Sequence, residues 1–561
     1  MNRIILSIFL LAPGLLLPAT VISPDMALRR LETFPMNKVM SGIRPELIYT
    51  SSGKSGATAY VFNYGNNGFV MLSADDLATP VLGFSDSARF DPDDIPCGLM
   101  FWMDCYARRL DVVRDEGYPA AIAIKAETVE REPLGPALTT KWGQSDPFNR
   151  HCPEIEDKPC VTGCVATAMA QVLNLYRYNG KGDGIYSYPW KYFGEAGPVE
   201  NELSYDFSSL DFDWDNMLDV YTGEYSDTEA DAVADLMLAC GISVDMNYGT
   251  GASGAVAQFV PYALWKHFGF NAGIYTVERD CFRDPEMSWD DFVYSQIREH
   301  GAVLYNGVTS ANEGHAFVCD GYREGGYFHF NWGWNGLSDG WFRLDALDPE
   351  VQGTGGSANS YAFKYQQNIH AFVSPGAEGE SWLPSICGRD DSFNVTAKNA
   401  SLGKKVKVTG SIINCSQLDY TLDFGCLLTD SEWNNEGQVL PVTSFDLESC
   451  GAKTIYNNVV FPEDIEEGIY CIRPVITWDG LGYWWSLPWN VKKDHVWLQI
   501  KDGTVYFNID PETAGVSLMP DDPDTASTTE YYTLQGVKIP KPERGRIYIR
   551  VSESGATKII Y

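Results

Sequence analysis

Basic residues and histidines are scarce in this chain, and beyond the first 23 residues no apolar run is long enough to span a bilayer. Lys and Arg number 41 against 75 Asp and Glu, so the formal net charge is -34 at pH 7. Phosphate backbones and anionic lipid headgroups repel such a protein, which excludes nucleic acid and membrane surfaces as expected partners. With only seven histidines, each can be considered as a catalytic base.

The first 23 residues are typical of a secretion signal. Arg3 supplies a positive start, and residues 4–18 are apolar. Because Pro13 and Gly14 interrupt the apolar run, we expect a signal peptide at 1–23 rather than a membrane anchor. We therefore expect a secreted or cell-surface protein without a membrane span, and a monomer.

The 561 residues are too many for one core, so several domains are expected. Residues 24–130 read as a first domain, in which 60–76 is a hairpin and 96–117 a helix ended by Gly117. Within it and just beyond, the charged stretch 123–136 resembles an exposed connector, where proteases cut.

A Trp-, Tyr- and Gly-rich domain is expected over 131–376. Alternating strands predict a β-sandwich over 380–508, and Val406, Val408 and Ile412 should share its buried face. Residues 509–561 read as a Pro/Asp/Thr-rich linker and a small C-terminal β segment, which is either a sorting module or a plain β terminus.

Thirteen cysteines in an exported chain predict disulfides, and the odd number leaves at least one without a partner within the chain. In "CVTGCVATAMAQ" (160–171), Cys164 precedes a helical pattern of apolar residues and follows Gly163, which permits a tight turn. A helix N-terminus favours a thiolate, so the thiol pKa should be lowered and Cys164 should be a nucleophile.

Other interpretations of Cys164 remain open from the residues alone. It is either a buried structural cysteine, a disulfide partner of Cys160, or part of a metal site, although CxxxC is an unusual zinc half-site. A disulfide between Cys152 and Cys160 would leave Cys164 free. No metal and no organic cofactor is expected.

A nucleophilic thiol needs a base, and His315 in "EGHAFVCDGY" (313–322) has the most suitable setting. It follows Gly314 and opens an apolar run typical of a buried strand. His329 alternates with aromatic residues and is expected to be a packed strand residue. Asn331 in "NWGWNG" has a side-chain oxygen able to accept the imidazole N–H, unless this run is only a hairpin turn.

Two further side chains complete the predicted site. Trp332 would shield the hydrogen bond of Asn331 from water. Gln144 in "KWGQSDPFN" would join the backbone N–H of Cys164 in an oxyanion hole, although a single glutamine is by default a surface residue.

Taken together these stretches resemble the streptopain family of secreted bacterial cysteine proteases over about residues 60–375. The resemblance also rests on "GISVDMNYGTGASG" (241–254), "NWGWNGLSDGWFRLDAL" (331–347) and "GTGG" (353–356). It implies an α+β papain-like protease domain, preceded by an α+β inhibitory prodomain at 24–130. The all-β, sandwich-like domains expected beyond residue 380 depart from the shortest members of the family.

The resemblance implies that Cys164 is the nucleophile, His315 the base and Gln144 an oxyanion-hole residue, with Asn331 and Trp332 beside the histidine. We expect Trp332, Gly314, Tyr248 and Ser253 to border the substrate; the last two lie in the Gly-rich stretch 248–255. Protein or peptide substrates would be hydrolysed through an acyl-enzyme, after cleavage of the connector releases the prodomain from the cleft. The alternative is a permanent extra domain.

Two rival functions remain open. The chain is either an adhesin on a protease scaffold, in which the C-terminal β domains bind the partner, or a thiol acyltransferase of the transglutaminase type. The intact set of Cys, His, Gln and Asn argues against an inactive scaffold.

Overall fold

The chain divides into two compact units, and each is described by itself. The first comprises residues 1–385 with 415–417, and the second the remaining residues from 386 to 561. The structure is a computed structural model that describes residues 21–31, 44–65, 68–76, 78–115, 131–271, 273–279, 287–308, 314–344, 368–371, 373–376, 386–388, 393–414, 416–430, 438–479, 485–486, 495–509 and, as backbone, 517–518, 530–532, 538–539, 547–552 and 555–560. The predicted signal peptide lies almost wholly outside this range.

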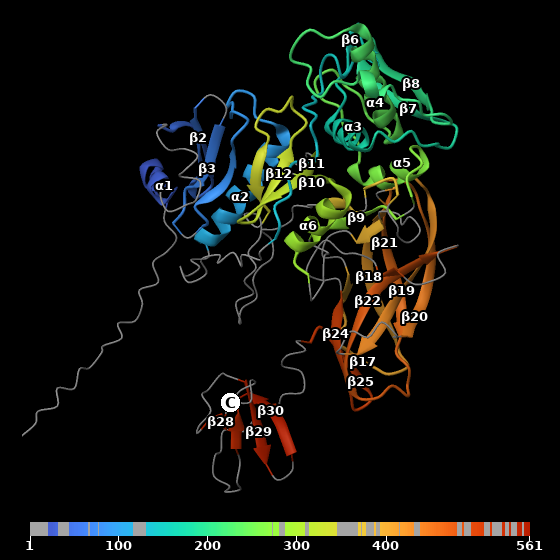
Figure 1. Cartoon of the computed structure of the whole chain (residues 1–561). Coiled ribbons are helices and arrows are strands. Elements are labelled where there is room, and N and C mark those ends of the chain that lie inside the picture. The colour runs from blue at the N-terminus through green and yellow to red at the C-terminus, as the bar shows by residue number, and fades with distance from the viewer. Residues whose placement is uncertain are drawn as a thin grey trace, which may run out of the picture. The chain divides into compact units, whose positions relative to one another are not determined.

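A ten-stranded antiparallel sheet runs through the first unit in the order β1-β2-β3-β4-β13-β12-β11-β10-β14-β9. Figure 1 labels β2, β3, β9, β10, β11 and β12 of this sheet. Its strands are β1 (Glu46–Gly53), β2 (Gly56–Tyr64), β3 (Gly68–Ser73), β4 (Val81–Ser85), β9 (Tyr275–Glu278), β10 (Val303–Val308), β11 (Gly314–Arg323), β12 (Tyr327–Asn331), β13 (Gly340–Arg343) and β14 (Asn368–Ala371). Strand β4 joins β13, with Phe84 opposite Trp341 and Gly83 opposite Phe342. The N-terminal region therefore shares one sheet with the region that carries His315.

Local structure in the N-terminal region agrees with the sequence pattern. Strands β2 and β3 form the predicted hairpin, and residues 66–67 of its turn lie outside the described range. The predicted helix is α2 (Cys97–Asp115), whose expected end at Gly117 also lies outside that range. Phe101 and Trp102 of α2 are buried in a core that includes Phe317 from β11.

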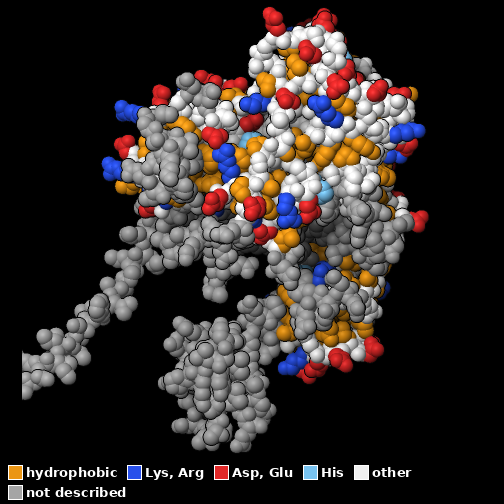
Figure 2. All heavy atoms as spheres, viewed as in Figure 1, with side chains coloured by type: hydrophobic (Ala, Val, Ile, Leu, Met, Phe, Trp, Pro, Cys, Tyr) orange, Lys and Arg blue, Asp and Glu red, His pale blue; other side chains and the backbone are white. Residues whose placement is uncertain are grey.

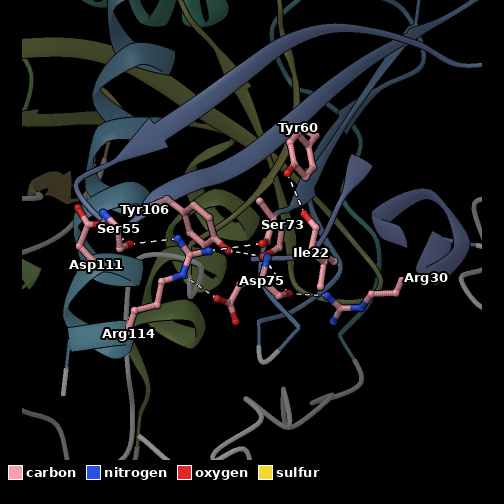
Figure 3. A network of polar contacts seen from close by, with 10 residues as sticks. Ile22, Arg30, Ser55, Tyr60, Ser73, Asp75, Tyr106, Asp111 and Arg114 are labelled. Atoms are coloured by element: carbon pink, nitrogen blue, oxygen red, sulfur yellow. Dashed lines mark hydrogen bonds and ion pairs between the residues drawn. The ribbon is translucent and has the colours of Figure 1, made fainter. Parts of the chain in front are cut away.

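A network of hydrogen bonds and an ion pair joins α2 to other segments of the N-terminal region (Figure 3). Arg114 of α2 donates to the carboxylate of Asp75, and their side chains are 6% and 0% exposed. Helix α1 (Pro24–Leu31) joins through Arg30, which donates to the backbone oxygen of Asp75 at 2.5 Å. Asp111 of α2 accepts hydrogen bonds from Lys54 N and Ser55 N, both at 2.8 Å. Residues far apart in sequence are therefore held at one end of α2.

The rest of the first unit packs around a second core. It contains the 3-10 helices η3 (Trp214–Asn216) and η4 (Ala257–Phe259), helices α3 (Cys164–Tyr176), α4 (Asp227–Ser243), α5 (Val260–Lys266) and α6 (Trp289–His300), and the hairpins β5 (Glu154–Ile155) with β6 (Lys158–Pro159) and β7 (Ile185–Gly194) with β8 (Gly197–Asp206). The core itself is made by α3, α4, α5 and the β7–β8 hairpin, while α6 packs on the sheet. The helix predicted after Cys164 is confirmed, because Val165, Ala168, Met169 and Val172 are all buried.

The second unit contains a β-sandwich. One sheet holds β15 (Ile386–Gly388), β16 (Asn394–Val395), β18 (Lys405–Asn414) and β21 (Ala452–Val460); the other holds β17 (Asn399–Ser401), β19 (Tyr420–Asp430), β20 (Gln438–Leu447), β22 (Gly468–Trp478), β23 (Trp485–Ser486), β24 (Val496–Lys501) and β25 (Thr504–Phe507). Both sheets contribute to one core. Val406, Val408 and Ile412 are buried in it, which confirms the predicted face of β18.

Five short strands follow the sandwich: β26 (Ser517–Leu518), β27 (Glu530–Tyr532), β28 (Lys538–Ile539), β29 (Ile547–Ser552) and β30 (Gly555–Ile560). They form one sheet. No helix within the described residues is both long and apolar enough to cross a membrane. Figure 2 shows acidic side chains spread over the visible face of the first unit, in keeping with the net charge.

Candidate active site

Cys164 is the first residue of α3, as the sequence predicts. Gly163 before it has a φ of 84°, a conformation that side-chain-bearing residues rarely adopt. A Cβ at Gly163 would also lie 2.8 Å from the sulfur of Met246 and 3.0 Å from the carbonyl oxygen of Ser253. The turn into the helix therefore requires glycine for both conformation and space.

The acidity of the Cys164 thiol differs from the prediction. Burial raises its pKa, although the backbone N–H groups of Ala316, Cys164 and Val165 act in the opposite direction. The expected lowering at the helix N-terminus is therefore wrong for this form of the protein, because the loss of solvation outweighs the helix end. The thiol needs a base to become a nucleophile at neutral pH.

His315 precedes Ala316, whose backbone contacts that thiol. It is half-buried on β11, opposite Gly307 of β10. The backbone N–H of Ala316, the next residue, donates to Cys164 Sγ at 3.4 Å. The structure therefore brings the strand that carries the predicted base into contact with the predicted nucleophile, although 151 residues separate the two in the sequence.

Two other histidines, His267 and His370, have surroundings that favour the neutral form. Burial lowers the pKa of His267 to about 4 and that of His370 to about 3. His329 on β12 is packed, as predicted, and forms a 2.6 Å contact with Asp320. Burial opposes its charge, but Asp320 more than compensates, so the pKa of His329 is raised.

The other two cysteines of the 152–164 stretch are separate thiols in the structure, so neither disulfide alternative is present. Burial raises the pKa of Cys152 to about 12 and that of Cys160 to about 11. Such thiols are inert, because the thiolate is the reactive species. Within the described residues, no group of three or more His, Cys, Asp or Glu side chains is placed to hold a metal ion.

Gln144 lies beside the loop that leads into α3. Its carbonyl oxygen accepts a hydrogen bond from Thr162 N at 3.1 Å, and its side chain is half-buried. Thr167 of α3 reaches the carbonyl oxygen of Gly143 at 3.5 Å. The segment that carries Gln144 is thus attached to the segment that carries Cys164.

Asn331 lies at the end of β12, but its amide is used differently from the prediction. Its Oδ1 accepts from Gln171 Nε2 and Gly333 N, both at 3.0 Å. Its Nδ2 donates to Thr140 O at 2.8 Å and to Gln171 Oε1 at 3.1 Å. Among the described residues, none of the hydrogen bonds of Asn331 goes to His315, since two backbone groups already fix the direction of its amide.

The sequence-based reasoning missed Gln171. This residue lies in the quoted motif "CVATAMAQ", seven positions after Cys164, which places both on one side of the helix. It is fully buried, which is unusual for glutamine. A polar residue at an otherwise apolar position of the predicted helix was the available signal.

Trp332 is buried against aromatic side chains, and its ring lies 4.8 Å from that of Phe317. Its indole N–H donates to Ser338 O at 3.0 Å. Helix α2 covers it, because a Cβ at Gly98 would lie 2.7 Å from Trp332 and 2.9 Å from Phe317. Trp332 is therefore enclosed as long as the N-terminal region is in place.

The remaining predicted substrate residues differ in exposure. Gly314 is exposed, with open space where a Cβ would lie. The hydroxyl of Ser253 donates to Val161 O at 2.6 Å and accepts from Gly249 N at 3.0 Å, so it braces the loop before Cys164. The prediction for Tyr248 is wrong. Its side chain is buried, with its hydroxyl against Gly241 of α4, and it packs in the core instead of bordering substrate. The stretch 353–356 lies outside the described residues.

Comparison with known proteins covers both parts of the first unit. The peptidase C10 family matches residues 142–342, and the Spi protease inhibitor family matches residues 32–110. Streptopain of Streptococcus pyogenes is 34% identical over 319 residues, which are 55% of this chain and 79% of the relative. The thiol protease/hemagglutinin PrtT of Porphyromonas gingivalis is 28% identical over 470 residues, or 80% of this chain and 52% of that protein.

A solved structure agrees with these matches. Prointerpain A of Prevotella intermedia superimposes with a TM-score of 0.50 at 32% identity, covering 60% of this chain and all of that fragment. This likeness confirms the expected layout of a papain-like domain with an N-terminal prodomain. The C-terminal all-β part is likewise as expected.

Proposed function

The chain belongs to the peptidase C10 family of cysteine peptidases, and we propose that it is a secreted endopeptidase, made as a zymogen, that cuts proteins through a Cys–His acyl-enzyme mechanism. The observation that carries the mechanism is the 3.4 Å contact of Cys164 Sγ with the backbone N–H next to His315. A nucleophile and a base at adjacent positions are what acyl transfer by a thiol requires.

In the proposed reaction, His315 accepts the thiol proton, and Cys164 Sγ forms a bond to the substrate carbonyl carbon. The negative charge on the carbonyl oxygen is stabilised by the side-chain amide of Gln144 and the backbone N–H of Cys164. His315 then protonates the leaving amine as the peptide C–N bond breaks. A water molecule, deprotonated by His315, hydrolyses the thioester and regenerates the thiol.

The zymogen proposal is supported by the contacts of α2. Its residue Gly98 lies against Trp332 and Phe317, and Phe101 lies against Gly307, the residue opposite His315. The N-terminal region therefore packs on the strands that carry the proposed base. We propose residues 24–130 as the inhibitory prodomain and residues 131–376 as the protease domain.

The contacts of Arg131 limit where the proposed cleavage of the connector can occur. It donates to Asp291 at 2.6 Å and contacts the rings of Tyr294 and Tyr322, and Leu134 pairs with Tyr322. Because the start of the protease domain is anchored, we propose that cleavage within the predicted connector falls before Arg131. We also propose secretion through a signal peptide at 1–23, a monomeric enzyme, and a β-sandwich over 380–508 followed by the segment 509–561.

The test uses the chain without residues 1–23, as wild type and as Cys164→Ala, followed by intact mass over time. We expect only the wild type to lose the N-terminal region and then to cleave casein, with the activity blocked by a thiol alkylator. If both proteins stay full length and inert after an added protease has cut the connector, the proposed function is wrong.

A second candidate function is adhesion, favoured by the match to a protein named thiol protease/hemagglutinin. That match covers 80% of this chain and so extends beyond the two regions matched by families. Haemagglutination by Cys164→Ala at the wild-type level would support this candidate. Incorporation of an amine in excess of hydrolysis would instead indicate a thiol acyltransferase.

A further inference from the structure

A buried pair of carboxamides joins the nucleophile helix to the end of β12. Gln171 Nε2 donates to Asn331 Oδ1 at 3.0 Å, and Asn331 Nδ2 donates back to Gln171 Oε1 at 3.1 Å. Gln171 is fully buried and Asn331 is 3% exposed. Each amide therefore depends on the other for hydrogen bonds that water cannot supply.

The orientation of both amides is determined by the backbone around them. Gly333 N donates to Asn331 Oδ1, and Asn331 Nδ2 donates to Thr140 O. Trp142 N donates to Gln171 Oε1 at 3.4 Å. Since a backbone N–H can only donate and a carbonyl can only accept, neither amide can rotate by 180° without leaving buried groups unpaired.

Gln171 also contacts the segment that leads to Gln144. Its Oε1 accepts from Thr140 Oγ1 at 2.9 Å, in addition to Trp142 N. Trp142 is fully buried and lies two positions before Gln144. One side chain therefore connects the proposed oxyanion residue, the nucleophile helix and the turn after β12.

Packing brings the same three segments together. A Cβ at Gly333 would lie 3.2 Å from the methyl carbon of Thr167, one turn after Cys164. Thr167 Oγ1 contacts Thr162 Oγ1 at 2.9 Å, in the loop before the nucleophile. The junction is closely packed, so a group of a different shape cannot replace an amide here without moving its neighbours.

We propose that Gln171 is a positioning residue of the peptidase. Its carboxamide holds Asn331 and the Trp142 segment against α3, and so sets the distance between the oxyanion donor Gln144 and Cys164 Sγ. Asn331 acts in this pair as the partner of Gln171, not as the acceptor of the His315 N–H. The inference rests on the proposed function.

The physical reason is that catalysis depends on distance more than on the presence of the groups. A displacement of about 1 Å in the reacting geometry lowers a rate by about 10²-fold. Replacing Gln171 by leucine leaves both polar atoms of Asn331 short of a partner at a dry site, so the Asn331 turn or the Trp142 segment must move to find others.

The test compares Gln171→Leu with Gln296→Leu in the full chain, both activated by a trace of wild-type enzyme. Gln296 is a buried glutamine of α6, 4% exposed, so its variant reports the general effect of losing such a side chain. We expect Gln171→Leu to lower kcat by about 10²-fold with KM within about threefold, and Gln296→Leu to leave both near wild type. The rate of Cys164 alkylation should fall in Gln171→Leu alone.

Gln171→Glu supplies a readout that a purely structural role would not change. A protonated carboxyl can accept from Trp142 N and donate to Asn331 Oδ1, as the amide does, whereas a carboxylate cannot donate. We expect kcat of Gln171→Glu to approach wild type at low pH and to fall as the pH rises through a pKa raised by burial. The melting temperature is recorded at each pH to correct for unfolding.

Three results would overturn the inference: a wild-type kcat in Gln171→Leu, an equal loss in Gln296→Leu, or a Gln171→Glu profile that superimposes on wild type. These results differ from failure of the proposed function, in which the wild type itself would be no more active than Cys164→Ala.

Discussion

The buried ion pair of Arg114 and Asp75 should stabilise the folded N-terminal region against an opened form that a protease can cut (Figure 3). Arg114 Nε donates to Asp75 Oδ2 at 2.8 Å, and the two side chains are 6% and 0% exposed. Arg114 also donates to Ser55 Oγ at 3.1 Å. We predict that Arg114→Leu accelerates removal of the prodomain far more than Arg108→Leu, a matched change on the same helix.

The two changes remove ion pairs that contribute very different amounts to the free energy of unfolding. Arg108 contacts Asp104 at 2.9 Å one turn away, and their side chains are 28% and 37% exposed. Exposed helical pairs contribute about 0.3–0.5 kcal/mol, whereas removing one partner of a buried pair costs about 3–5 kcal/mol because the other charge stays buried. Since 1.4 kcal/mol is about a factor of ten, the opened form should become about 10² to 4 × 10³-fold more populated in Arg114→Leu and less than about threefold in Arg108→Leu.

The assay uses both variants in a Cys164→Ala background, so that no molecule digests itself. A trace of active enzyme is added, and intact mass follows the loss of the region before Arg131. When reclosing is faster than cleavage, the observed rate is proportional to the population of the opened form. Urea unfolding of the same proteins gives the free energy of unfolding independently.

Equal cleavage rates for Arg114→Leu and Arg108→Leu would refute the reasoning, because the buried pair would then contribute no more than an exposed one. A slow Arg114→Leu with a normal unfolding midpoint would refute it as well. If Arg114→Leu does not fold, Arg114→Lys keeps the charge but loses the planar fork, and its rate should lie between those of Arg114→Leu and the parent.

Three further predictions concern the site and its supports. Gln144→Ala should lower kcat by about 10²–10³-fold, measured on a peptide substrate after activation, and an unchanged kcat would remove Gln144 from the oxyanion hole. Burial raises the pKa of Asp339 to about 6 from 3.8, so its folded carboxyl favours the proton and the wild type loses about 3 kcal/mol of stability as the pH rises from below 3.8 to above 6. Asp339→Asn should therefore gain stability relative to the Cys164→Ala parent between pH 4 and pH 7 in urea unfolding, whereas a difference independent of pH would contradict this assignment. Ser253→Ala removes two loop hydrogen bonds and should lower the free energy of unfolding by about 1–2 kcal/mol, which an unchanged urea midpoint would disprove.

Patterns between residues close in sequence predicted local structure well. The helix after Cys164 follows from its apolar positions at i, i+3 and i+4, and the turn before it from Gly163. The buried face of β18 follows from alternation at Val406 and Val408. Such elements could be predicted because their cause lies within a few neighbouring residues.

The position of His315 was predicted less directly, from the scarcity of histidine and the motif around it. That a 151-residue gap closes to bring its strand to Cys164 depends on β11 packing against α3, which no local pattern specifies. The wrong expectations have the same origin. The pKa of Cys164 and the burial of Tyr248 depend on which distant residues exclude water from them.

Local sequence patterns therefore specify the chemistry available to this protein: the proposed nucleophile at a helix start, the proposed base, and the alternation of strands. Long-range packing specifies the rest: β4 extends the sheet of β13, Arg114 contacts Asp75, and Gln171 pairs with Asn331 across 160 positions. The physical reason is that hydrogen bonding and charge in a dry interior depend on partners brought together only by the packing of the whole core.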